Sequence, residues 1–189
     1  MVEFLLRSDR SEAAQHAWAL YVRGRCEGYP DSDHIFNGDF ELDPTRSPFD
    51  WRFGDRPGFS GSIDDHVAYA GRRSARVSFD GTENVGWSAI SESAFMPPGR
   101  YTFQAHVRTD GLTTDRGVFF GIVGTDIDVA TEPMTGTSDW HLVEKKFQVP
   151  ASAGLLEVKL TRNPSLKFAN KIKGTVWIDD VKIAPAEAR

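Results

Sequence analysis

The sequence has little of several features that would assign it quickly to a class. Its single cysteine, Cys26, excludes an internal disulfide framework and a cysteine-rich zinc site. No apolar run approaches the roughly 20 residues that a membrane-spanning helix needs. Positive charge is not in excess, because 22 Lys and Arg against 27 Asp and Glu give a net charge of −5, which argues against nucleic-acid binding. Residues 1–7 lack the basic and apolar regions of a signal peptide.

What the chain does have is length and aromatic side chains. Its 189 residues fit one medium domain with a short attachment, and 40% of them are hydrophobic, which is too many for a disordered chain. It carries 5 Trp, 4 Tyr and 13 Phe. These absences and this composition together predict a soluble, aromatic-rich globular domain.

A helix is predicted over residues 9–23. Asp9 is a suitable N-cap, and Ala14, Trp18 and Tyr21 recur at helical spacing, so they would form one apolar contact face. The sequence leaves open whether this helix docks on the domain that follows or ends a preceding helical domain. We treat residues 1–34 as a helical extension.

Residues 35–189 are predicted to be a β-sandwich, because short alternating runs follow one another between turns rich in Gly, Pro and Asp. Residues 101–109 alternate cleanly and place Gln104, His106 and Arg108 on one face. The expected strands cover residues 75–80, 86–96, 101–109, 117–124, 140–149, 155–161 and 175–183.

Three motifs in this region resemble those of a known fold family. Asn37-Gly-Asp-Phe-Glu41, followed by Trp51, resembles the opening of galactose-binding-like jelly rolls, which include many carbohydrate-binding modules. Pro98-Gly-Arg-Tyr-Thr-Phe103 resembles the start of a central strand of that fold, and Trp177-Ile-Asp-Asp-Val181 resembles its last strand. The resemblance spans residues 35–184 and implies an all-β jelly-roll β-sandwich.

A narrower resemblance links the chain to C-terminal domains of bacterial tetratricopeptide-repeat proteins. It is carried by residues 108–117 and 162–174. It would make the first helix the tail of a helical repeat region, and it implies a helical repeat domain of the same protein as a partner. It brings no established activity. If the chain belongs to a longer exported protein, the resemblance favours a periplasmic or extracellular location.

The galactose-binding-like resemblance also implies a structural calcium ion that joins the first and last strands. The matching positions are Glu41 and Asp179, with a backbone oxygen near Gly71. Calcium prefers carboxylate and carbonyl oxygens held by irregular loops. The alternative is that Glu41 and Asp179 pair with arginines.

A sugar site requires an aromatic platform and polar side chains that bind hydroxyl groups. By resemblance Trp51, Trp140 and Trp177 are expected in the core, which leaves Trp87 as the platform. The predicted ligand-binding residues are Trp87, Gln104, His106, Arg108, Arg162 and Asn170.

No catalytic motif is found in the sequence. A glycosidase with paired carboxylates is left open, with Asp64/Asp65 and Asp126/Asp128 as nominal candidates, but these residues are expected to be solvated turn residues. Ser60 lies in a turn-rich segment and not in a nucleophile elbow, and no His-Glu-x-x-His motif is present. The prediction is therefore a non-catalytic carbohydrate-binding module of a larger bacterial protein, with a polysaccharide or oligosaccharide as ligand. The alternative is a structural or protein-interaction domain that packs on helical repeats and binds no sugar. An N-terminal helix that covered the Gln104, His106 and Arg108 face would favour the alternative.

Overall fold

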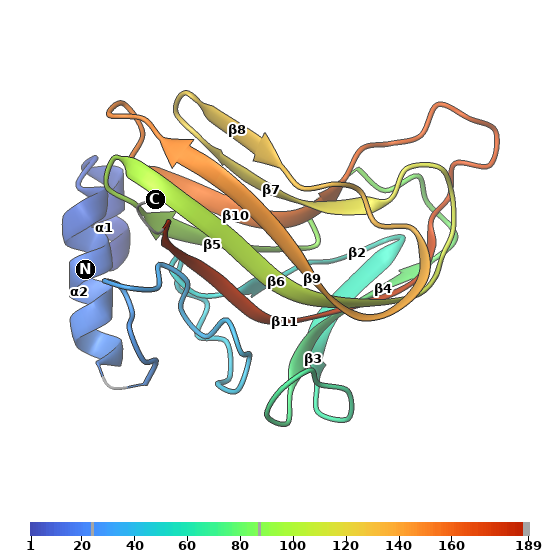
Figure 1. The fold of residues 1–189 in the computed structure, drawn as a ribbon, viewed down its shortest axis with the longest axis horizontal. Coiled ribbons are helices and arrows are strands. Elements are labelled where there is room, and N and C mark those ends of the chain that lie inside the picture. Colours follow the sequence, from blue (N-terminus) through green and yellow to red (C-terminus); the bar gives the residue numbers. More distant parts are fainter. Residues whose placement is uncertain (24, 87, 187–189) are drawn as a thin grey trace.

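Alternating apolar and polar residues build two antiparallel sheets that face each other across a hydrophobic core (Figure 1). The computed structural model describes residues 1–23, 25–86 and 88–186. Sheet A has the strand order β1-β5-β10-β7-β8, with β1 (Arg52–Phe53), β5 (Ile90–Phe95), β10 (Leu155–Arg162), β7 (Val118–Gly124) and β8 (Ile127–Ala130). Sheet B has the order β2-β3-β4-β11-β6-β9, with β2 (Asp55–Arg56), β3 (Phe59–Asp64), β4 (Ser74–Asp80), β11 (Lys173–Pro185), β6 (Gly99–Leu112) and β9 (Gly136–Val149).

The predicted jelly-roll β-sandwich is confirmed, and each of the seven expected strands is present. The core lies between the inner faces of the two sheets, where Phe103 of β6 meets Phe120 of β7 with ring centroids 4.9 Å apart. Strand β9 has an irregularity between Ser138 and His141. Phe119 is half-buried, because its buried neighbours in β7 take the inward positions.

The opening motif (residues 37–41) and the last-strand motif (residues 177–181) contact each other, and this contact explains their residue types. The N–H of Val181 in β11 donates to the carbonyl of Gly38 at 2.9 Å. A Cβ on Gly38 would lie 1.9 Å from the Val181 carbonyl oxygen, so only glycine allows this approach. Asn37 is buried and bonds both backbone groups of Leu42. The opening motif is therefore fastened to the last strand.

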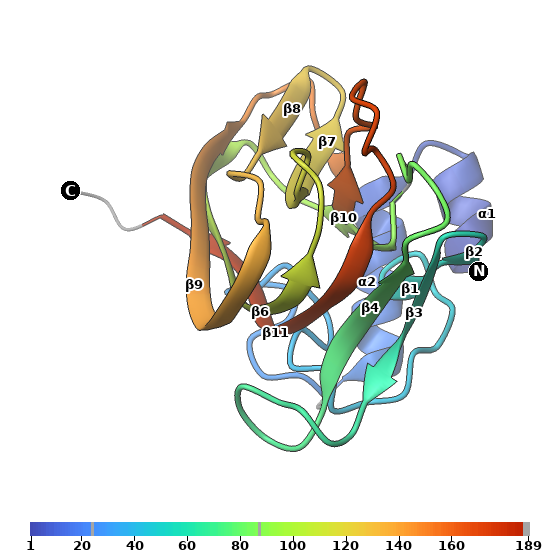
Figure 2. The ribbon, with the colours of Figure 1, turned by 90° about the vertical axis from the view of Figure 1, so that its right-hand side faces the viewer.

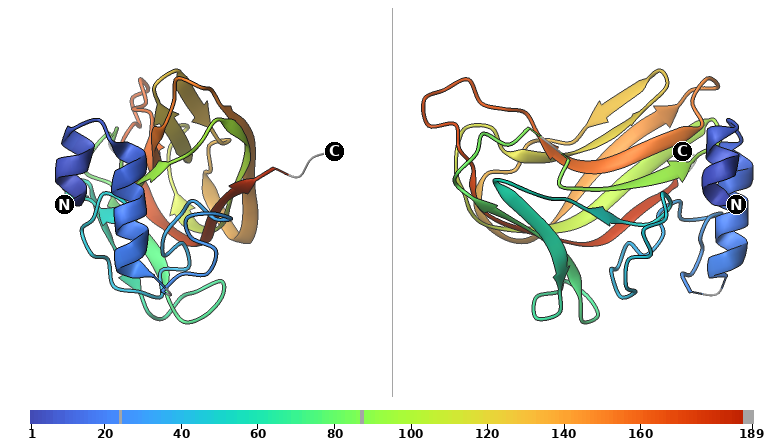
Figure 3. Two further views of the ribbon diagram at one scale, coloured as in Figure 1. Left: turned by 90° about the vertical axis from the view of Figure 1, so that its left-hand side faces the viewer. Right: turned by 180° about the vertical axis from the view of Figure 1, so that it is seen from behind.

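Two short helices, α1 (Val2–Arg7) and α2 (Ser11–Val22), pack side by side at one end of the sandwich (Figures 1 and 3). Ala14, Trp18 and Val22 of α2 form a second apolar cluster with Phe36 and Phe49. The helices thus pack on the segment that precedes the sheets. No helix in the described ranges is long and apolar enough to cross a membrane.

The helical segment differs from its prediction in three respects. The helix α1 was not expected, and α2 begins at Ser11 because Asp9 adopts a φ of 55° outside the helix. The N-cap of α2 is Arg10, which makes no side-chain capping bond. Tyr21 is 69% exposed and does not share the buried face of Trp18.

Candidate functional site

The outer face of sheet B carries the polar residues that strand alternation predicted. In β6, Ala105 and Val107 point inward and are buried, whereas Gln104, His106 and Arg108 point outward and are half-buried. The helices pack at the end of the molecule instead of over this face (Figure 1). Gln104, His106 and Arg108 therefore lie together on a face that the N-terminal helices leave open.

Trp177 lies between two arginines in one row across sheet B. It pairs with Arg76 of β4 on one side and with Arg108 of β6 on the other. Both guanidinium groups lie over its ring, with their Cζ atoms 6.0 and 5.4 Å from the centroid. This is a cation–π arrangement that holds the indole in place.

Asp64 fixes the orientation of that indole. The Trp177 Nε1–H donates to its Oδ2 at 2.9 Å, and its Oδ1 accepts the N–H groups of His66 and Val67. Partial burial alone would raise the pKa of the Asp64 carboxyl, but these hydrogen bonds outweigh burial and lower the pKa. Asp64 therefore stays ionised and keeps accepting from Trp177.

A second group of rings lies next to this row. Tyr69, which is 47% exposed, stacks on His106 with centroids 3.6 Å apart and planes 8° apart. Trp140 of β9 lies 5.9 Å from the Tyr69 ring. The His106 Nδ1 atom lies 3.3 Å from the Asp180 carboxylate. We call the set Tyr69, Arg76, His106, Arg108, Trp140 and Trp177 the aromatic face.

The aromatic face corrects the expectation that Trp140 and Trp177 lie in the core. Trp177 alternates with the buried Val176 and Ile178, so it points outward. Trp140 lies on the outer strand of sheet B and is also half-buried. The alternation of residues in β11 already indicated that Trp177 points outward. No sequence signal indicated Tyr69, because it comes from a loop.

The remaining predicted sugar-binding residues do not join this face. Trp87 lies outside the described residues. Arg162 is 2% exposed, and its guanidinium donates to the carbonyls of Arg116, Val85 and Asn170 and to two side-chain oxygens. Arg162 thus joins loops inside the protein and is not placed on an open edge as its predicted role requires. Asn170 is held there through its backbone oxygen.

Glu41, Gly71 and Asp179, the predicted calcium residues, meet around one loop. The Asp179 carboxylate accepts the N–H groups of Tyr69 and Ala70, and Glu41 Oε1 accepts those of the two residues after Gly71. Burial raises the pKa of Asp179, and hydrogen bonds from the loop oppose that rise. The two carboxylates retain unused lone pairs, so their chemistry fits a hard cation. The same hydrogen bonds position Tyr69 over His106.

One further group has metal-ligating side chains close together. Ligand atoms of Asp64, Asp65 and His66 all lie within 4.8 Å of one another. His66 pairs with Asp65 at 2.7 Å, and Asp64 is occupied by Trp177. These contacts account for the cluster without an ion.

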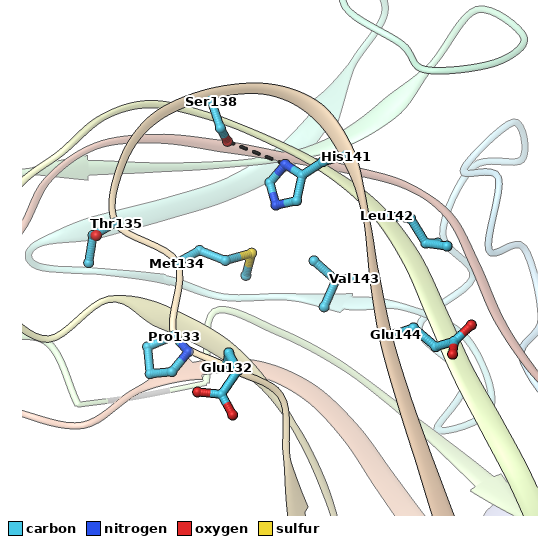
Figure 4. A pocket seen from close by; sticks show the side chains of 9 residues that line it. All are labelled: Glu132, Pro133, Met134, Thr135, Ser138, His141, Leu142, Val143 and Glu144. Atoms are coloured by element: carbon cyan, nitrogen blue, oxygen red, sulfur yellow. Dashed lines mark hydrogen bonds between the residues drawn. The ribbon is translucent and has the colours of Figure 1, made fainter.

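A cavity of about 500 Å³ opens beside β9 (Figure 4). Met134, Leu142 and Val143 supply apolar side chains, and His141 reaches toward them from the strand. Its lining contains no tyrosine or tryptophan. The cavity is thus chemically distinct from the aromatic face.

The chain is similar to known proteins in structure and not in sequence. No protein-family model matches the chain, and no curated protein matches it. Among solved structures it is similar to TmCBM61 in complex with β-1,4-galactotriose, with a TM-score of 0.58 and 13% identity over 82% of this chain and 99% of that one. It is also similar to the C-terminal family 22 carbohydrate-binding module of Clostridium thermocellum Xyn10B. The TM-score is 0.56 and the identity is 16%, over 87% of this chain and 98% of that chain.

A third similar structure is the CBM22-1 xylan-binding domain of Paenibacillus barcinonensis Xyn10C. Its TM-score is 0.54 and its identity is 13%, over 80% of this chain and 94% of that chain. The matches cover nearly the whole of these modules, which confirms the resemblance read from the motifs as a resemblance of fold. The chain has the jelly-roll β-sandwich architecture of carbohydrate-binding modules.

Proposed function

We propose that this protein is a non-catalytic module that binds a carbohydrate on the aromatic face. The observation that carries the proposal is the exposed Tyr69 ring stacked on His106, with Trp140 beside it and Trp177 on the same outer face. The similarity to modules that bind xylan and galactotriose supports it. A polysaccharide or oligosaccharide is the proposed ligand.

The chemistry of the face suits a sugar. The C–H side of a pyranose ring packs on an aromatic ring, while guanidinium, amide and carboxylate groups bind its hydroxyls. Arg108 and Arg76 flank Trp177, and Gln104 lies on the same strand as His106. Arginine and amide groups thus lie on the same outer face as the rings.

A glycan array followed by calorimetric titration tests the proposal. We expect Tyr69→Ala and Trp177→Ala each to weaken binding of the best glycan by about tenfold or more, because central aromatic residues dominate such interfaces. Phe119→Ala is the matched control, since it removes a half-buried aromatic from the outer face of sheet A. A silent array, or equal losses in all three variants, would contradict the proposal.

The protein-interaction alternative has one observation in its favour. Phe4 of α1 and Leu20 and Tyr21 of α2 are 70%, 59% and 69% exposed. Such a surface would suit a helical repeat domain of the same protein. Hydrogen exchange tests this: in the longest natural form of the protein the two helices should exchange more slowly than in this chain, and equal exchange would contradict the alternative.

We keep the calcium ion as a separate proposal. Glu41 and Asp179 would supply carboxylate oxygens, and an ion there would further fix the loop that carries Tyr69. Because a ligand that binds only the native state stabilises it, added calcium should raise the melting temperature and EDTA should reverse the rise. Identical melting curves in calcium and in EDTA would remove this proposal.

A further inference from the structure

The loop between β10 and β11 projects from the end of the sandwich opposite the helices (Figures 1 and 3). At its tip Leu166 is 98% exposed and Phe168 is 105% exposed relative to a free residue, more than the other large apolar side chains in the described ranges. Single exposed apolar residues are common on proteins, but two fully exposed ones on one narrow tip are not.

Hydrogen bonds and an ion pair hold the loop that carries these two exposed side chains. Ser165, directly before Leu166, accepts from and donates to the Asn84 amide, and its hydroxyl donates to Asp115 at 2.7 Å. Lys167, between the two apolar residues, pairs with the same Asp115 at 3.2 Å. The buried Arg162 guanidinium secures the far side through the Asn170 carbonyl. The loop thus presents Leu166 and Phe168 outward from a fixed base.

Lysines gather around the tip although the whole chain is acidic. No Asp or Glu occurs between Val158 and Ile178, whereas Lys167, Lys171 and Lys173 all fall within this stretch. Lys167 pairs with Asp115, so the exposed Lys171 and Lys173 supply the positive charge that would attract an anionic surface.

A cavity of about 300 Å³ lies beneath Phe168. It is lined by Thr113, Thr114, Asn170 and Lys171 together with Phe168 and Ala169. The Thr113 and Thr114 hydroxyls already donate to the carbonyls of Lys171 and Arg116, so the Lys171 ammonium is the donor suited to a phosphate oxygen here. The tip thus combines two apolar anchors with lysines beside them.

We infer that this tip binds the surface of an anionic lipid bilayer, with Leu166 and Phe168 inserted among the acyl chains and the lysines on the phosphate headgroups. A bilayer accepts isolated apolar side chains because its interior is fluid, and it attracts clustered lysines when its lipids are anionic. A stable protein interface needs about 800 Å² on each partner, which two side chains on a narrow tip do not offer. The lipid surface is therefore the favoured occupant.

Vesicle flotation tests this inference. The chain should float with vesicles that contain one third phosphatidylglycerol, and not with vesicles of phosphatidylcholine alone. Leu166→Ser with Phe168→Ser should reduce bound protein by about tenfold, since both apolar anchors are lost. Replacing Lys167, Lys171 and Lys173 by Gln should reduce binding and its dependence on salt.

Two controls make the outcome decisive. Leu142→Ser removes a 48% exposed leucine from β9 and should leave vesicle binding unchanged. Because the tip side chains are fully exposed, the double variant should keep the parent melting temperature. Failure to float with anionic vesicles, or full binding by the double variant, overturns the inference. Loss of glycan binding in Phe168→Ser without any vesicle binding would instead place the tip in the sugar site.

Discussion

The outer faces of the two sheets carry different chemistry, although both arise from alternating strands that fill one core. Apart from Phe119, sheet A presents small and ion-paired residues: Glu157 of β10 binds Arg52 at 3.2 Å and Lys159 at 3.4 Å, and Lys159 lies opposite Gly121 of β7. Sheet B presents the aromatic face. The inner faces must be apolar in any such sandwich. The difference between the outer faces therefore indicates where this protein's own function lies.

The comparison predicts that changes at the end of sheet A affect stability but not binding, and the largest effect is expected at Arg162. Arg162→Met should lower the free energy of unfolding by about 3 kcal/mol, because it leaves buried carbonyls without donors. Urea unfolding measures this loss. The folded variant should keep the parent glycan affinity. A large change in affinity at unchanged stability would contradict the assignment of binding to sheet B.

In sheet B, a change at Asp179 should affect both stability and glycan binding. Asp179→Ala removes the carboxylate oxygen that accepts the N–H groups of Tyr69 and Ala70. We expect a loss of about 2 kcal/mol in unfolding free energy together with weaker glycan binding, since Tyr69 is no longer held over His106. The measurements belong in EDTA, so that any calcium effect is removed. Unaltered glycan affinity would show that the position of Tyr69 does not matter.

In β5 of sheet A, the buried Glu92 should set the pH dependence of stability. Burial raises the pKa of Glu92 well above its usual value, and the charges of Asp50 and Asp33 raise it further, while the Phe36 N–H opposes the rise. Burial likewise raises the pKa of Asp33 to about 6. An acid whose folded pKa is raised stabilises the fold at low pH, and this contribution is lost as pH rises through the folded pKa.

Glu92→Gln keeps the acceptor for Phe36 and removes the ionisation. Its unfolding free energy should therefore exceed that of the parent increasingly as the pH rises from 5 to 8 (roughly the range where buried acids ionise). Burial lowers the pKa of His34, so His34 makes the fold less stable as the pH falls below its usual pKa. This contribution is the same in the parent and in Glu92→Gln, so it cancels in the difference between them. A pH-independent difference in urea unfolding would refute the assignment.

The smallest effect is expected on the exposed ion pairs of sheet A. Glu157→Gln should change the unfolding free energy by less than about 0.5 kcal/mol and should leave glycan titrations unaltered, because surface ion pairs contribute little. A clear loss of glycan affinity here would move the binding site to sheet A.

The sequence by itself determined the class of fold and the direction of many side chains. Alternation in residues 101–109 predicted that Gln104, His106 and Arg108 share an outer face, because side chains in a strand alternate with period 2. Gly38 and Asn37 predicted the opening of a jelly roll, and the structure supplies the reason in the approach of Val181. Local periodicity carries the first kind of information, and the resemblance to a known fold family carries the second.

Only the tertiary structure decided which residues meet. Tyr69 stands over His106 because Asp179, 110 residues later, holds its backbone, and no local pattern encodes such a distant contact. Arg162 looked like an exposed polar residue, but five acceptors from distant loops surround it. The count of aromatic residues predicted an aromatic-rich globular domain. Which of these residues remain for a ligand depends on strand register and loop closure, and both are set by packing across the whole chain.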